Sequence, residues 1–209
     1  VAEQLDKTAG RAAVEARHGA HYLAFIAART EPLLRADAPE LFAEVQRELS
    51  NIVQAWRWAS ARGRLPELDG AAYGLALFCW HAGLSREGAG WLAEAAAELE
   101  AFVARAPGLA AETEARRLLA KLLALRARLL LPQGRNDEAV ELGERAAALA
   151  AASGGGAGEA YAALALGMAL RRRGESSRAG ELLHRAAALA RQLQERGDHQ
   201  PMLPDVERL

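Results

Sequence analysis

The sequence is poor in cysteine and in aromatic residues. Cys79 is the only cysteine, and aromatic residues make up 5% of the 209 positions. A single cysteine excludes a disulfide within the chain and is typical of a protein from a reducing compartment, so we expect a cytoplasmic protein. No run reaches the roughly 18 apolar residues that a membrane-spanning helix needs. We therefore expect no membrane partner.

An excess of positive charge is also lacking. The chain has 26 Lys and Arg against 27 Asp and Glu, a net charge of −1. Because nucleic-acid readers usually carry a clear basic excess, we expect no nucleic-acid partner for this chain. The start, Val1-Ala2-Glu3-Gln4-Leu5, is polar and does not resemble a secretory signal. It has no initiator methionine, which indicates a piece of a longer protein.

Alanine and leucine dominate the apolar residues, which are 51% of the chain. This composition favours helix, because alanine loses the least side-chain freedom there. Strand-like runs of Val, Ile and Thr are missing, so we predict an all-α fold of about eight helices joined by short connections as four antiparallel hairpins. The predicted helices cover about 11–35, 39–62, 68–82, 85–105, 110–131, 136–152, 157–173 and 176–196.

One stretch of the chain occurs twice. Residues 134–150 return as residues 174–190, with Ala139, Gly143 and Ala146 matched by Ala179, Leu183 and Ala186, an offset of 40 residues. A repeat of this size corresponds to one helix pair, which cannot bury its apolar face without a neighbouring pair. The pattern predicts a right-handed superhelical array of hairpins, an α-solenoid. Small residues at these positions allow close helix approach.

This spacing of small residues resembles the tetratricopeptide repeat. Gly167 and Ala127 each lie twelve residues before an alanine of the following helix, as the repeat pattern requires. The chain departs from that pattern because Leu123 and Ala163 occupy the usual tryptophan position. Its period of 40 also exceeds the usual value of about 34 residues.

Three earlier segments resemble the helical linker of STAND-type regulatory ATPases, a family that includes LuxR-type regulators. The segments are residues 15–24, residues 48–59, with the pattern E-x-x-N-x-x-x-A-W-x-W, and residues 83–95, with the pattern G-x-x-x-E-G-x-x-W-L-x-x-A. The resemblance implies linker hairpins over 1–105, two tetratricopeptide-like repeats over 106–196 and an irregular tail at 197–209.

The resemblance also implies a function. In that family the repeat array senses an inducer or a protein partner, and other domains supply nucleotide hydrolysis and output. No Gly-x-x-x-x-Gly-Lys-Ser/Thr motif occurs here. We therefore expect a sensing domain of a larger bacterial signal-transduction ATPase or transcriptional regulator, with no catalytic residues, cofactor or metal. A stand-alone scaffold for protein partners is the alternative.

Arrays of helix pairs bind along the concave wall that the first helix of each pair forms. Aligning Ala127 with Gly167 predicts that the concave positions are Phe78, His81, Lys121, Arg128, Tyr161, Met168 and Arg171. Aromatic, methionine and arginine side chains are enriched in recognition surfaces. A solvated basic face over an ordinary core is the plainer interpretation of the same residues.

Three other features have plain structural explanations. His18 and His21 share a helix face, but a metal site needs further ligands. Cys79 has no base placed to activate it, which favours a buried filler. The Gly154–Gly156 run follows a helix rather than a strand and lacks a Lys-Ser/Thr, so it indicates a turn rather than a phosphate loop.

Overall fold

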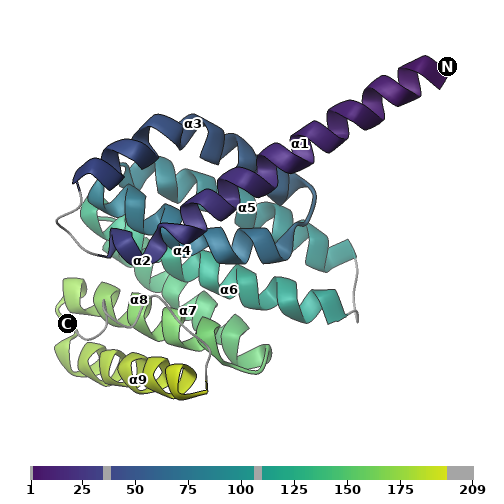
Figure 1. The fold of residues 1–209 in the computed structure, drawn as a ribbon. Helices are drawn as coiled ribbons and strands as arrows, with labels where there is room; N and C mark the ends of the chain where they lie inside the picture. Colours follow the sequence, from purple (N-terminus) through teal and green to yellow (C-terminus); the bar gives the residue numbers. More distant parts are fainter. Residues whose placement is uncertain (1, 35–38, 106–109, 197–209) are drawn as a thin grey trace.

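A computed structural model describes residues 2–34, 39–105 and 110–196, so the predicted tail at 197–209 lies outside the described residues. Within these ranges the protein is all-helical, with nine α-helices and no strand (Figure 1). The prediction of an all-α fold is confirmed. In order, the helices are α1 (Ala2–Ala28), α2 (Thr30–Leu33), α3 (Pro39–Ala61), α4 (Leu65–His81), α5 (Ser85–Arg105), α6 (Ala110–Leu130), α7 (Asn136–Ala152), α8 (Ala157–Arg173) and α9 (Ser176–Glu195), with a 3₁₀ turn η1 (Leu131–Gln133) between α6 and α7.

The first predicted helix, at 11–35, is divided in two in the structure. Pro32 explains the break, because proline has no N–H to donate to the carbonyl of Ala28, and its ring collides with that carbonyl. α1 therefore ends at Ala28, and the short α2 follows. Thr30 keeps one bond across the break, from its hydroxyl to the carbonyl of Ile26, at 3.3 Å.

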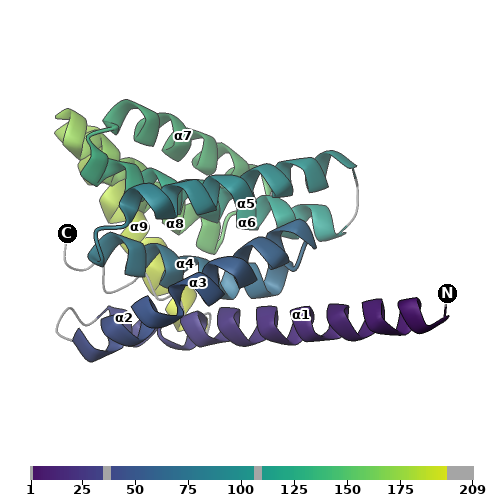
Figure 2. The same ribbon diagram turned by 90° about the horizontal axis from the view of Figure 1, so that it is seen from above.

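Consecutive helices pack against each other, and several helices, such as α3, α4 and α6, also contact the helix after next. α6 contacts α5, α7 and α8, while α4 contacts α5 and α6. α1 lies against α3 and α4, and its first half extends beyond the rest of the protein (Figures 1 and 2). As a result, α4, α6 and α8 lie next to one another in that order.

The 40-residue repeat is also a repeat of backbone geometry. Gly134 and Gly174 both adopt left-handed conformations, with φ of 73° and 87°, that end η1 and α8. The next amide in each case, of Arg135 or Glu175, donates to a leucine carbonyl five residues earlier, at 3.3 and 3.0 Å. Glycine is needed at this position because other residues pay a steric cost there.

Small residues hold the repeated helices close together, as the sequence indicates. A side chain added at Gly143 in α7 would meet the Cβ of Leu166 in α8 at 3.0 Å. One added at Gly167 in α8 would meet Leu183 of α9 at 2.9 Å and the carbonyl oxygen of Ala179 at 3.2 Å. Both glycines are therefore required by the close approach of two helices.

The core of the first half is built around Trp56. Its side chain is fully buried, and its indole N–H donates to the carbonyl oxygen of Trp91 at 3.1 Å. Trp91 itself is half-buried, and Trp58 is half-buried against the backbone of Gly19 in α1. Trp56 thus ties α3 to α5, while Trp58 ties α3 to α1.

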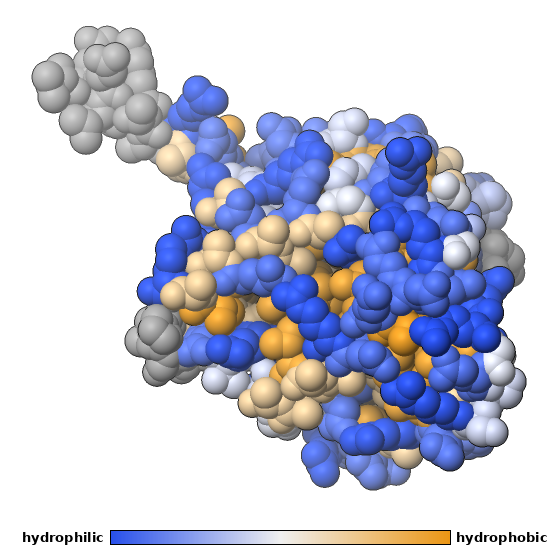
Figure 3. Space-filling model, turned by 180° about the vertical axis from the view of Figure 1, so that it is seen from behind, coloured by the Kyte–Doolittle hydropathy of each residue, from blue (hydrophilic) through white to orange (hydrophobic). Residues whose placement is uncertain are grey.

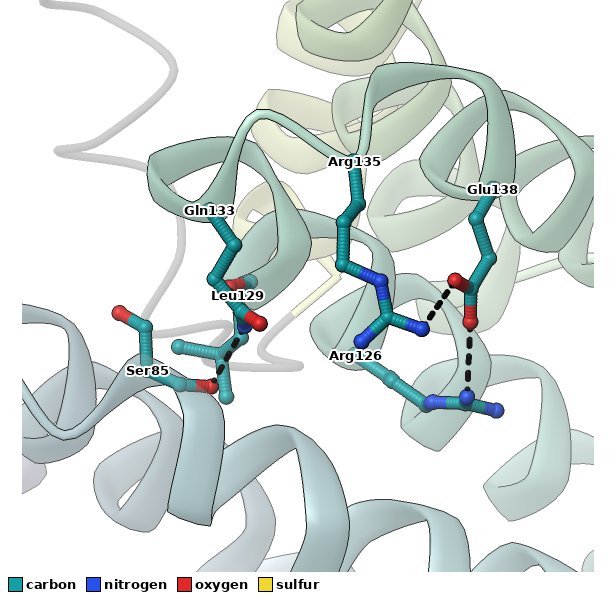
Figure 4. Close-up of polar contacts among 6 residues, drawn as sticks. All are labelled: Ser85, Arg126, Leu129, Gln133, Arg135 and Glu138. Atoms are coloured by element: carbon teal, nitrogen blue, oxygen red, sulfur yellow. Dashed lines mark hydrogen bonds and ion pairs between the residues drawn. The ribbon is translucent and has the colours of Figure 1, made fainter.

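Polar contacts fix the turn between α6 and α7 (Figure 4). The amide of Gln133 donates to the carbonyl oxygens of Leu129 and Ser85, at 2.8 and 3.1 Å, and so links this turn to the start of α5. Glu138 of α7 accepts from Arg126 of α6 and from Arg135. These contacts hold α5, α6 and α7 at one end.

Candidate functional site

A continuous row of aromatic and charged side chains crosses α4, α6 and α8. We call this row the inner surface; its contacting residues are Asp69, Tyr73, Trp80, Lys121, Arg128 and Tyr161, and by helical spacing it continues along α8 to Met168 and Arg171. The rings of Tyr73 and Tyr161 lie 5.5 Å apart, which joins α4 to α8. The guanidinium of Arg128 lies 5.8 Å from the ring of Tyr73 and 5.9 Å from that of Trp80. These cation–π contacts join α6 to α4.

Lys121 of α6 makes contacts with two other helices. Its ammonium donates to the backbone oxygen of Asp69 at 2.8 Å and to the Asp69 carboxylate at 2.9 Å. It also lies 5.2 Å from the centre of the Tyr161 ring. One side chain of α6 thereby contacts both α4 and α8.

The accessible residues of the inner surface lie toward the C-terminal ends of these helices and, near the start of α4, at Asp69. Trp80, Arg128 and Met168 are half-buried, and Arg171 is exposed. Lys121 and Tyr161 have only 9% and 1% of their surface exposed. The structure therefore brings together Lys121, Arg128 and Tyr161 of the predicted set, with Tyr73 between Arg128 and Tyr161. Met168 and Arg171 share only a helix face with Tyr161.

Phe78 and His81 do not lie on the inner surface, which corrects the sequence analysis. Phe78 is fully buried, and its ring stacks on that of Phe42 of α3 at 6.1 Å. His81 is exposed and lies edge-on to the same Phe42 at 5.7 Å. Both belong to the contact between α3 and α4.

The α4 residues that do line the surface, Tyr73 and Trp80, were missed in the sequence. Their spacing of seven residues equals that of Lys121 to Arg128 and of Tyr161 to Met168, so a signal was present. Residues seven apart share a helix face. Equivalent residues of the later repeats are 40 residues apart. Tyr73 and Lys121, like Trp80 and Arg128, are instead 48 apart, so the 40-residue offset selected the wrong residues of α4.

A hollow of about 570 Å³ opens beside Lys121. It is lined by residues of α4, of α6 and of the turn and first residues of α8, namely Leu65, Pro66, Asp69, Gly70, Glu114, Arg117, Leu118, Lys121 and residues 154–158. Arg117 reaches into the same hollow, and its Nε donates to the carbonyl oxygen of Ser153 at 2.9 Å. Volumes of 300 to 1,000 Å³ are usual for small-ligand sites, so the hollow is of adequate size.

A second hollow, of about 430 Å³, lies between α3 and α5 and is lined by Leu49, Ser50, Val53, Gln54, Arg57 and Trp91. Arg57 is paired there with Glu94 at 3.0 Å. On the face opposite to that of Figure 1, apolar side chains show between hydrophilic ones (Figure 3). The inner surface is therefore the more distinctive candidate.

Cys79 is packed against Gly88 in the core. Burial raises the pKa of its thiol to about 12, and the nearby Glu87 carboxylate acts in the same direction. The reactive thiolate is therefore disfavoured at neutral pH. This agrees with its interpretation as a buried filler.

His18 and His21 surround Tyr22, with ring centres 4.7 and 4.9 Å away. Burial and the Glu48 carboxylate raise the pKa of Tyr22, whose hydroxyl accepts from Asn51 at 3.1 Å. Across the described parts of the chain, no three His, Cys, Asp or Glu side chains are grouped to hold a metal ion. Both histidine rings therefore pack on Tyr22 of their own helix.

The chain matched no protein-family model, no curated protein and no solved structure in the comparisons made with each. Its class therefore rests on its own features: an all-helical protein with a repeated helix pair and an aromatic and cationic row across α4, α6 and α8. None of the helices described has the length and apolar character needed to cross a membrane.

Proposed function

We propose that this protein is a right-handed superhelical array of antiparallel, tetratricopeptide-like hairpins that binds a partner along its inner surface. Its partner would be a protein segment or a small inducer. In this proposal the array is the sensing region of a STAND-type bacterial regulator. Binding changes the curvature of the array and so its contact with the rest of the regulator.

The packing pattern supports the array. α6 contacts the helix before it, the helix after it and the first helix of the next pair. Successive pairs in a stacked array make this set of contacts. The matched glycine turns at Gly134 and Gly174 support an equivalent build for the last two pairs.

The observation that carries the binding proposal is the row from Trp80 through Arg128 and Tyr73 to Tyr161 and Lys121. Three helices that are not consecutive in the chain contribute to it. Tryptophan, tyrosine and arginine are the residues that most often dominate binding energy at interfaces. A change in the spacing of α4, α6 and α8 would disturb every contact of this row, which is what a sensor requires.

A paired screen tests this function. A thermal-shift screen of sugars, nucleotides and small metabolites detects an inducer, and a peptide array detects a protein segment. Each hit is then measured against two charge reversals, Arg171→Glu and Arg105→Glu. Both arginines are exposed and lie in the last turn of a helix, α8 and α5 respectively, so their helix-dipole effects match.

We expect Arg171→Glu to weaken binding by about tenfold. Arg105→Glu, which lies off the inner surface, should leave binding unchanged. Equal effects of the two changes would contradict binding at the inner surface. Peptide hits without any small-molecule hit would favour the stand-alone scaffold over the inducer sensor.

A further inference from the structure

We propose that the hollow beside Lys121, between α4, α6 and the turn at 154–158, binds a carboxylate of the partner in place of the Asp69 carboxylate. This inference rests on the proposed binding function and names the chemistry of one contact. The carboxylate would come from an acidic side chain of a protein segment or from a small organic acid.

The unequal exposure of the Lys121–Asp69 pair is the first observation. The Lys121 side chain is 11% exposed, whereas that of Asp69 is 57% exposed. A cation that is so far removed from water needs an anion beside it. Its present partner, however, is largely solvated and loses little when it turns away, because exposed ion pairs are weak. The pair is therefore open to exchange for another carboxylate.

A second cation faces the same hollow. Arg117 and Lys121 are four residues apart on α6, which places them on one face about 6 Å apart. The one hydrogen bond that Arg117 makes to a described residue is its Nε bond to the carbonyl of Ser153, so its other four N–H donors make none within the described part of the chain. A carboxylate between the two could accept from both.

The shape of the hollow leaves room for this group. Gly154, Gly155 and Gly156 form one wall, and all three have positive φ, between 72° and 88°. Glycine suits this conformation, and no side chain projects from these three positions. The hollow of about 570 Å³ holds much more than one carboxylate, so the rest of a peptide or organic acid also fits.

The exchange would have a structural consequence. Asp69 belongs to α4, and Lys121 carries the contacts to α4 and to Tyr161 of α8. A carboxylate that replaces Asp69 removes one link between α4 and α6 and leaves the link to α8 in place. This is a local event of the kind that biases one arrangement of packed helices over another.

Isothermal titration calorimetry at low salt tests the site, with the full chain and three probes: succinate, a hexaglutamate peptide and inorganic phosphate. Lys121→Met keeps the apolar stem but removes the charge, and we expect it to weaken carboxylate binding at least about tenfold. Asp69→Asn removes the competing carboxylate, so it should strengthen binding by about threefold or more. Glu100→Gln, which neutralises a surface carboxylate paired with Arg145 of α7, is the matched control and should change nothing.

Asp69→Asn is expected to raise the affinity for a carboxylate and Lys121→Met to lower it, so the test remains valid even if one variant is unstable. Binding of succinate or of hexaglutamate shows which source supplies the carboxylate. No binding of either probe, or no gain with Asp69→Asn, overturns the proposal. Equal binding of phosphate, with the same dependence on Lys121, overturns the assignment to a carboxylate. A partner that still depends on Arg171 after these failures would leave the proposed function standing.

Discussion

At the scale of single residues, the close contact between Gly19 and Trp58 holds α1 against α3. A Cβ added at Gly19 would lie 2.2 Å from Cε3 of the Trp58 ring. Arg62 and Arg64 lie over that ring at 5.5 and 5.8 Å and hold it in place. We predict that Gly19→Ala lowers the free energy of unfolding by about 1–3 kcal/mol through overpacking. Chemical denaturation measures the change.

Gly90→Ala is the matched control for this prediction. Gly90 is exposed in the second turn of α5, and no atom lies within 4 Å of an added Cβ. Alanine there should raise the free energy of unfolding by about 0.5–1 kcal/mol, because glycine is the poorer helix former. If both substitutions shift stability in the same direction, the contact between Gly19 and Trp58 is not what requires glycine.

At the scale of helices, we predict that Gly167 and Leu183 are coupled. Gly167→Ala places a methyl group 2.9 Å from Cδ2 of Leu183 and should destabilise the protein. The double variant with Leu183→Ala should be more stable than the sum of the two single effects by about 1 kcal/mol, because the truncated side chain leaves space. A double-mutant cycle in urea measures the coupling. Strict additivity would mean that α8 and α9 adjust without strain.

For helices and their contacts, the sequence predicted some features and could not predict others. The repeat predicted the close contact of Gly167 with α9, because spacing along one helix pair depends on local geometry alone. The break between α1 and α2 could also have been placed, since Pro32 sits four residues after Ala28. The repeat could not predict which residues of α4 line the inner surface. Their identity depends on the lengths of α5 and of the connection to α6, which the repeat does not include.

The inner surface illustrates a further limit. The types of its residues were visible in the sequence, but their burial was not. Tyr161 and Lys121 were expected as contact residues, and the structure buries both in links between α4, α6 and α8. Such links join residues far apart in the chain: 40 positions for Lys121 and Tyr161, 52 for Lys121 and Asp69, and more for Tyr73 and Tyr161. No pattern within one helix reports them.

At the scale of the whole molecule, the question is whether a local loss of stability affects all helices or only the neighbouring ones. An array predicts nearest-neighbour behaviour, whereas a closed bundle predicts one cooperative unit. α9 contacts α8 most extensively and closes one end of the described helices, while α6 has neighbours on several sides. We therefore predict faster amide exchange in α9 than in α6.

Ala186→Gly tests whether a loss of stability in one helix reaches only its neighbours. Ala186 is fully buried in α9, and glycine there should cost about 1 kcal/mol in helix propensity, with a further loss from the missing methyl group. In an array, hydrogen exchange followed by mass spectrometry should accelerate in α9 and α8 and remain unchanged in α3 and α4. Acceleration of equal size in every helix would contradict the array. The contact between Tyr73 and Tyr161 makes α4 the first of the distant helices in which any spread of the effect would be seen.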